Sequence, residues 1–124
     1  MNAIPIYIIN LDRSPERLTY IQRQFSKSNL EFNRVPAVDG AKLPKGELSR
    51  YKNESKYSLS HYSSLSNGEI GCSLSQKFAW NIAAKGCHCA TVILEDDVKI
   101  SDKFSSVIQS LYENMDENII TDLK

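Results

Sequence analysis

The feature that most restricts the fold is the nearly continuous apolar run of Ala3–Asn10, rich in isoleucine and ending in a polar turn. A strand with one face in water alternates apolar and polar side chains, whereas a strand covered on both faces is apolar throughout. We therefore expect a strand buried between two layers near the start of the chain. Such strands are typical of α/β domains.

A helix is expected directly after this strand. Ser14-Pro15-Glu16 is typical of a helix start: Ser can accept hydrogen bonds from free N–H groups, Pro suits the first turn, and Glu suits the positive end of the helix dipole. Leu18, Ile21 and Phe25 then share one helical face, up to about residue 29. A second short strand is expected over about Glu31–Val35. The order strand, helix, strand predicts a βαβ unit with parallel strands.

The middle of the chain is less regular. We expect a turn at Ala37–Gly40 and no regular element over Lys45–Ser66, whose second half is rich in serine. This composition is typical of a surface loop. An alternative is a segment that becomes ordered over a substrate.

Regular patterning returns in the second half. Asn67 is a possible N-cap and Gly86 a possible end of an amphipathic helix. Cys89–Leu94, apolar and partly β-branched, is expected to be the central strand. Ser101 could cap a last helix, and Asn118–Lys124 could begin a further strand. The apolar face expected for the first of these helices contains Ile70, Leu74, Phe78 and Ile82, with Ala79 and Trp80 beside it, and that for the last contains Phe104, Val107, Ile108 and Leu111.

Composition limits the classes of function. The 124 residues suffice for one domain, expected over 1–124, and the 15 basic residues balance the 15 acidic ones. Binding to a nucleic-acid backbone normally needs a basic excess, so we expect no nucleic-acid partner. No apolar run is long enough for a membrane span, and the start lacks the basic region of a signal peptide. The three cysteines do not form a disulfide framework, and the expected compartment is the cytoplasm.

The most informative motif is Glu95-Asp96-Asp97, which directly follows the expected central strand. Three adjacent carboxylates repel one another unless protons, solvent or a cation relieve the repulsion. Ligands of open α/β sheets bind at the carboxyl ends of the strands, and carboxylate oxygens are the ligands that Mg²⁺ and Mn²⁺ prefer. The motif thus favours a divalent ion that bridges the protein to a diphosphate. The alternative is an acidic turn at a helix start, where carboxylates complement the dipole.

A second candidate lies in the turn after the first strand, Asn10-Leu11-Asp12-Arg13, followed by Arg17 one helical turn later. The carboxyl ends of parallel strands lie at one edge of the sheet, so this turn should share an edge with the acidic motif. Arg13 and Arg17 could hold a phosphate there. Alternatively, both arginines are simply solvated.

Other chemistry has weaker support. Cys87-His88-Cys89 with Cys72 suggests zinc, but structural sites usually pair ligands two to four residues apart. His61 lies in the serine-rich segment and is expected to be exposed. A phospho-accepting receiver domain has a similar length, but its acidic pair would follow the first strand, where only Asp12 stands.

Four segments, in order, resemble glycosyltransferase family 25, the bacterial lipopolysaccharide and lipooligosaccharide galactosyltransferase group that also includes collagen galactosyltransferase domains. The similar segments are Ile8–Arg17, Pro36–Gly40, Gly68–Ser75 with Trp80, and Val92–Val98.

The resemblance implies a GT-A-like nucleotide-binding sandwich with a mostly parallel sheet. It implies transfer of a sugar, commonly galactose from UDP-galactose with inversion, to a lipid-linked oligosaccharide acceptor, with Mn²⁺ or Mg²⁺ as cofactor. Glu95 and Asp97 would hold the metal. The residues implied at the nucleotide-sugar site are Asn10, Leu11, Arg13, Asp39, Gly40, Glu69, Ser75, Glu95 and Asp96.

Two departures from the family pattern lead to an alternative. Gln76 stands where the family usually has a histidine, and Gln cannot titrate near neutral pH. Family members are also commonly longer, so the chain is expected to be the N-terminal, nucleotide-sugar-binding portion, truncated on its C-terminal side. The alternative is a non-catalytic relative that binds nucleotide weakly or only self-associates through an uncovered surface. The resemblance also places the protein at the cytoplasmic side of the inner membrane, as a possible peripheral protein.

Overall fold

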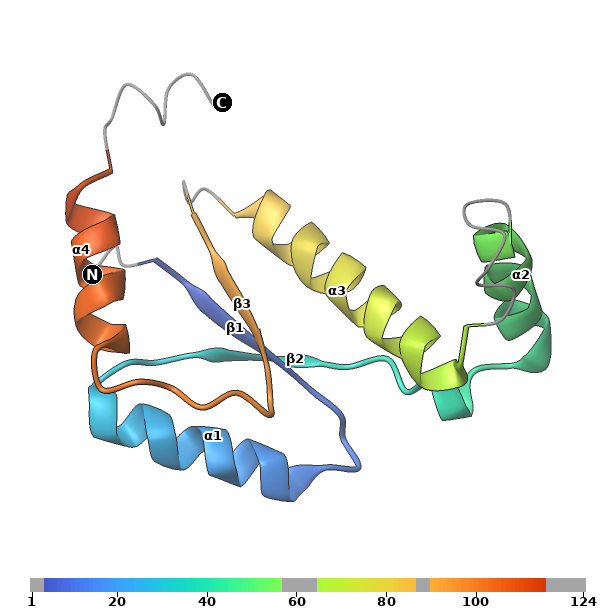
Figure 1. Ribbon diagram of the computed structural model, residues 1–124, viewed down its shortest axis with the longest axis horizontal. Helices are drawn as coiled ribbons and strands as arrows, with labels where there is room; N and C mark the ends of the chain where they lie inside the picture. The colour runs from blue at the N-terminus through green and yellow to red at the C-terminus, as the bar shows by residue number, and fades with distance from the viewer. Residues whose placement is uncertain (1–3, 57–64, 87–89, 116–124) are drawn as a thin grey trace.

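The computed structural model describes residues 4–56, 65–86 and 90–115, with side chains omitted for 52–56. These residues form an open sheet of three parallel strands in the order β2-β1-β3 (Figure 1). The strands are β1 (Ile6–Asn10), β2 (Asn33–Pro36) and β3 (Val92–Glu95). Tyr7 pairs with both Asn33 and Ile93, so all three strands end near one edge. The predicted α/β class and parallel sheet are confirmed, and the arrangement is consistent with part of a GT-A-like sandwich.

Helices cover both faces of the sheet. On one face, α1 (Pro15–Ser28) and the start of α4 (Phe104–Glu113) pack over the strands. The opposite face is covered by α3 (Asn67–Lys85). The first strand is therefore buried on both sides, as its sequence predicts, and Ile8 has no exposed surface.

The predicted helix after the first strand is also confirmed. Ile21 and Phe25 are buried against Ile6 and Ile8, and Asn29 ends the helix with a positive φ of 59°. Ser14 precedes the helix as predicted, but its side chain makes no capping hydrogen bond. The carbonyl oxygen of Ser14 instead accepts from the side chain of Asn10.

The position predicted for the third strand is wrong within the described sheet. The sequence predicts Cys89–Leu94 at the centre, but β3 begins at Val92 and lies at one edge, while β1 is central. An apolar run indicates burial on two faces, and it cannot say which neighbours are present along the edges.

The prediction of no regular element after Lys45 is wrong as well. Helix α2 (Lys45–Lys56) lies beyond the end of the sheet, beside the first turns of α3, and a short 3₁₀ turn, η1 (Gly40–Lys42), precedes it (Figure 1). Among the α2 side chains that the structure describes, Leu48 alone is buried. A helix with so little buried surface needs no apolar stripe, and its sequence therefore lacks the periodic signal.

The apolar face predicted for α3 is only partly correct. Ile70 is buried, but Phe78 and Trp80 are 48% and 60% exposed. The other buried residues of this helix are small: Gly71, Ser75 and Ala79. Ala79 packs against the sheet, whereas Gly71 and Ser75 contact the turn after β2. Helical geometry explains the difference, because a four-residue spacing drifts around a helix of 3.6 residues per turn.

The helix starts differ slightly from expectation. Ser66, rather than Asn67, caps α3, with its hydroxyl accepting from the Glu69 N–H. Ser101 accepts hydrogen bonds just before α4, which begins at Phe104 after Lys103. On α4, Ile108 is buried, whereas two residues of the expected face, Val107 and Leu111, are about half exposed.

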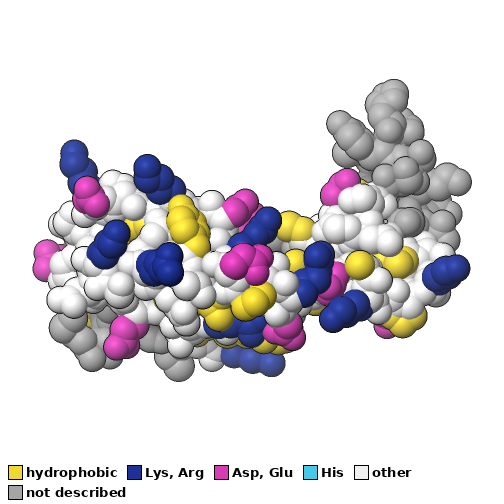
Figure 2. Space-filling model, turned by 90° about the horizontal axis from the view of Figure 1, so that it is seen from below, with side chains coloured by type: hydrophobic (Ala, Val, Ile, Leu, Met, Phe, Trp, Pro, Cys, Tyr) yellow, Lys and Arg dark blue, Asp and Glu magenta, His cyan; other side chains and the backbone are white. Residues whose placement is uncertain are grey.

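The surface carries mixed charge. Figure 2, seen from the α1 side, shows Lys and Arg side chains interspersed with Asp and Glu. None of the described helices combines the length and apolar character needed to cross a bilayer. The strand considered for Asn118–Lys124 and the segment around His61 lie outside the described residues.

Candidate functional site

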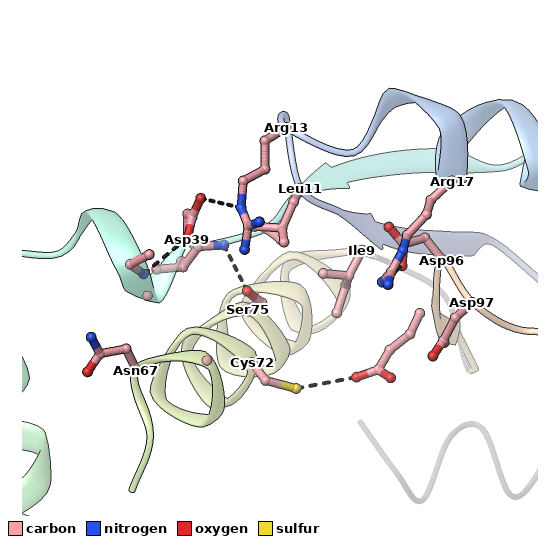
Figure 3. Close-up of a pocket in the computed structure, with 16 residues that line it drawn as sticks. Ile9, Leu11, Arg13, Arg17, Asp39, Asn67, Cys72, Ser75, Asp96 and Asp97 are labelled. Carbon is pink, nitrogen blue, oxygen red and sulfur yellow. Dashed lines mark hydrogen bonds and ion pairs between the residues drawn. The ribbon is translucent and has the colours of Figure 1, made fainter.

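A cavity of about 310 Å³ opens where the strands end and α3 begins (Figure 3). Its walls come from the turns after all three strands and from the first turns of α1 and α3. This is the edge at which open α/β sheets bind ligands. The lining residues are Ile9, Leu11, Arg13, Arg17, Ala37, Val38, Asp39, Gly40, Ala41, Asn67, Gly68, Cys72, Ser75, Glu95, Asp96 and Asp97.

Close backbone packing positions α3 against one wall of the cavity. A Cβ atom added to Gly71 would lie 2.7 Å from both the Gly40 nitrogen and the Val38 oxygen, and one added to Gly40 would collide with the carbonyl of Asn67. The buried hydroxyl of Ser75 accepts from the Val38 N–H at 2.8 Å and donates to the carbonyl of Gly71. The first turns of α3 are therefore held directly to the turn after β2.

An ion pair between Arg13 and Asp39 joins the turn after β1 to the turn after β2. The Nε atom of Arg13 donates to Asp39 Oδ2 at 2.8 Å, and the arginine side chain is 60% exposed while that of Asp39 is 12% exposed. The other carboxylate oxygen of Asp39 accepts from the Ala41 N–H and caps η1. Asp39 is therefore fixed from two sides, whereas the guanidinium of Arg13 stays accessible.

The outer carboxylates of the acidic motif are exposed at the other side of the cavity. The thiol of Cys72, on α3, donates to Glu95 Oε1 at 3.3 Å, drawn as a dashed line in Figure 3. This hydrogen bond, with burial and the nearby charges of Glu95 and Asp97, raises the pKa of Cys72. The thiol therefore stays protonated and remains a donor to Glu95.

The central carboxylate, Asp96, is buried and hydrogen-bonded. Asn10 donates to its Oδ2 at 2.7 Å, and Arg17 lies 3.4 Å from its Oδ1. Asn10 is itself 1% exposed and accepts from Nε of Arg34 on β2 at 2.9 Å. This network joins the ends of all three strands behind the cavity.

The structure brings most of the predicted site residues together. Those lining the cavity are Leu11, Arg13, Asp39, Gly40, Ser75, Glu95, Asp96 and Asp97. Asn10 lies behind them, in contact with Asp96. Glu69 is exposed on the first turn of α3 and does not line the cavity. Its predicted contact with the donor stays a prediction.

The structure contradicts one of the alternatives for these motifs and leaves others in place. The acidic motif does not start a helix, because α4 begins only at Phe104. Arg13 and Arg17 are more than half exposed, yet each makes an ion pair with an acidic residue of the cavity. The zinc hypothesis involves 87–89, which lie outside the described residues. Within the described ranges, no three or more His, Cys, Asp or Glu side chains are grouped so that they alone hold a metal ion.

Sequence reasoning missed two residues that matter here. Arg34 lies in a strand with no recognisable motif, and its contact with Asn10 depends on the pairing of β1 with β2. The sequence suggests Cys72 as a zinc ligand and as a member of the Gly68–Ser75 motif, but it does not predict that the thiol donates to Glu95. The sequence carries no local signal for the role of Arg34, because neighbouring residues of a strand point to opposite faces and the pairing of β1 with β2 is a long-range contact.

Comparison with known proteins identifies the family of the chain. The model of glycosyltransferase family 25, described as an LPS biosynthesis protein, matches residues 3–124. A Drosophila melanogaster "Glycosyltransferase 25 family member" is 33% identical over 105 residues, which are 80% of this chain and 17% of that protein. Human "Procollagen galactosyltransferase 2" is 32% identical over 115 residues, 90% of this chain and 18% of that protein.

A rat protein named "Probable inactive glycosyltransferase 25 family member 3" is 30% identical over 117 residues, 89% of this chain and 20% of that protein. The chain thus spans a fifth or less of the length of these relatives. The family match, by contrast, covers nearly every residue of the chain and includes all the motifs that line the cavity. The chain belongs to glycosyltransferase family 25.

Proposed function

We propose that this chain binds a UDP-sugar in the cavity at the strand ends and serves as the donor-binding part of a glycosyltransferase. The observation that carries the proposal is the cavity itself: it joins segments from four separate parts of the chain, the same four that resemble the family's motifs. A site assembled from such distant segments at a sheet's ligand-binding edge is typical of nucleotide recognition in α/β folds.

The acidic motif fits a divalent cation, Mn²⁺ or Mg²⁺. Glu95 and Asp97 line the cavity and are exposed, so their oxygens are accessible to an ion. Such cations typically take one or two protein carboxylates and complete their coordination with water and substrate phosphates. When bound, the cation would stabilise the negative charge of the departing diphosphate.

The arginines supply the complementary charge. Arg13 and Arg17 line the cavity, with 60% and 55% of their side chains exposed. Guanidinium groups form paired hydrogen bonds with phosphate oxygens. Arg13 and Arg17 would therefore hold the diphosphate, with Leu11 and Val38 providing apolar surface beside it.

The names of the family and of its members support a proposal for the sugar and the acceptor. We propose galactose as the sugar, because one relative is named a procollagen galactosyltransferase. We propose a lipopolysaccharide or lipooligosaccharide acceptor, because the family description names LPS biosynthesis. A lipid-linked acceptor would bring the protein to the cytoplasmic face of the inner membrane as a peripheral protein.

Calorimetry of UDP binding with and without Mn²⁺ tests the proposal. We expect binding that depends on Mn²⁺ in the wild type, and Asp97→Ala should weaken it by about tenfold or more, because a cation ligand is lost. Asp102→Ala is the matched control, since it removes the same charge outside the cavity. Equal affinity in all three proteins, with and without Mn²⁺, would contradict the proposal.

Gln76 favours a second candidate, a relative that binds the donor without transferring the sugar. Gln76 follows Ser75 on α3, does not line the cavity, and replaces the usual histidine with a group that does not titrate near neutral pH. The rat relative with "inactive" in its name supports this candidate. Self-association would then use exposed apolar residues such as Phe78 and Trp80.

Turnover separates the two candidates. Release of galactose from UDP-galactose, measured for the wild type and for Gln76→His, should be higher in the variant if the histidine supplies the missing proton chemistry. A wild-type chain that turns over and runs as a monomer in light scattering would exclude the second candidate.

A further inference from the structure

We propose that Asp96 is a positioning residue: Asn10, oriented by Arg34, holds its carboxylate, which fixes the acidic turn so that Glu95 and Asp97 face the cavity. The inference rests on the proposed function and deepens it. It assigns different roles to three adjacent carboxylates that the sequence presents alike.

Both oxygens of Asp96 already have protein partners. Oδ2 accepts from Asn10 at 2.7 Å, and Oδ1 lies 3.4 Å from a guanidinium nitrogen of Arg17. The side chain is 10% exposed, whereas Glu95 and Asp97 on either side are exposed. Asp96 contributes to the cavity wall, but both of its oxygens already have protein partners, Asn10 behind the wall and Arg17 at its surface.

Asn10 is held in one orientation. Its amide nitrogen donates to Asp96 and to the carbonyl of Ser14, and its amide oxygen accepts from Arg34. A guanidinium group can only donate, so the amide oxygen must face Arg34 and the amide N–H groups must face Asp96. Arg34 also donates to the main-chain carbonyl of Asn10 at 3.0 Å, which fixes the guanidinium in turn.

The network ties the acidic turn to the other two strands. Arg34 comes from β2, Asn10 ends β1, and Asp96 directly follows β3, so one chain of hydrogen bonds links all three strands. Among the described residues, every buried side-chain nitrogen and oxygen has a partner. If Asp96 turned outward to a ligand, the buried amide of Asn10 would lose an acceptor, which is costly.

Replacing each carboxylate by its amide tests the division of roles, with UDP and MnCl₂ as the probe. Asp96→Asn keeps one acceptor oxygen, which can still face Asn10, and gives up only the long 3.4 Å contact with the exposed Arg17. We therefore expect the dissociation constant of UDP to change less than about threefold. Asp97→Asn should weaken binding by about tenfold or more, because it removes a cation ligand. Equal losses in the two variants would overturn the inference.

Exchanging the two groups gives a second test. Asn10→Asp places two carboxylates together in a buried site and should lower the melting temperature by about 5 °C or more. Adding Asp96→Asn restores a donor and an acceptor across the contact, so the double variant should recover most of that loss and of the UDP affinity. Both proteins lack the amide that donates to Ser14, so they form a matched pair.

Arg34→Lys tests the contact between Arg34 and Asn10. A lysine keeps the charge and loses the directed Nε contact, so the UDP affinity should fall while Asp96→Asn remains close to wild type. Failure of the double variant to recover thermal stability would overturn the contact between Asn10 and Asp96. A wild type that shows no Mn²⁺-dependent UDP binding would instead contradict the proposed function, and the melting temperatures would still test the contact.

Discussion

The two faces of the sheet are packed in opposite ways. On the α1 face, large side chains fill the core: Ile21 and Phe25 pack against Ile6 and Ile8, and the ring of Phe25 meets that of Phe32 edge-on at 4.8 Å. On the α3 face, the helix approaches with small residues, and the helix backbone lies directly against the turn after β2.

We infer that the α1 face contributes mainly to the stability of the fold, whereas the α3 face shapes the cavity. Removing atoms is costly on the α1 face, where burial of large apolar groups stabilises the fold. Adding atoms is costly on the α3 face, because the close approach defines one wall of the cavity. Substitutions on the two faces should therefore affect thermal stability and UDP affinity in different proportions.

The largest loss of stability is expected for Phe25→Ala, on the α1 face. Deleting this buried ring should lower the free energy of unfolding by about 3–5 kcal/mol. Chemical denaturation measures the loss, and Phe25→Leu, which retains more of the side-chain volume, should lose less. At a temperature where the variant is folded, the UDP affinity should remain within about twofold of wild type, because Phe25 does not line the cavity. A much larger change in affinity would remove the distinction between the faces.

Gly71→Ala, on the α3 face, should have the opposite pattern, with a smaller loss of stability and a larger loss of UDP affinity than Phe25→Ala. The new methyl group would lie 2.7 Å from two backbone atoms, so α3 must move away from the turn after β2. We expect a loss of about 1–3 kcal/mol in stability and a clear loss of UDP affinity. Gly46→Ala is the matched control: its methyl group meets nothing within 4 Å, and alanine favours a helix. Equal behaviour of the two variants would show that close packing at Gly71 is unimportant.

Ser75→Ala removes one hydrogen bond from the same contact. The Val38 N–H would lose its acceptor, which should cost about 1–2 kcal/mol. Ser73→Ala, on the exposed side of α3, should cost less than about 0.5 kcal/mol. Thermal unfolding of both variants checks the difference, and similar melting temperatures would contradict the role of Ser75.

The smallest effect on stability is expected for Glu95→Gln, and its effect is measured through the reactivity of the Cys72 thiol. Glu95 raises the pKa of the thiol, so the reactive thiolate is scarce at pH 8. Glu95→Gln removes that charge, lowers the pKa towards its ordinary value and should speed alkylation by iodoacetamide. The experiment uses a Cys87→Ser/Cys89→Ser background, so that Cys72 is the single thiol. An unchanged rate would show that the thiol does not contact Glu95.

Much of the fold could be predicted from the sequence, because local patterns suffice for it. The apolar run before Asn10 predicts a strand buried on two faces, and Ser14-Pro15-Glu16 predicts where the next helix begins. The α2 helix could not be predicted, because an exposed helix has no apolar stripe in its sequence. The buried face of α3 could not be predicted either, because small residues give a weak hydrophobic signal even where they are tightly packed.

By itself, the sequence determined the parallel α/β architecture and the clustering of turns at one edge, because the order of strands and helices dictates where the strand ends meet. Tertiary structure decided which carboxylate of the acidic motif is buried. Three adjacent acidic residues look alike in the sequence, and their environments differ only through distant partners. Asn10, which holds Asp96, is 86 residues away along the chain, and Arg34 comes from another strand. Side-chain roles at this site therefore depend on long-range hydrogen bonds, which no local pattern contains.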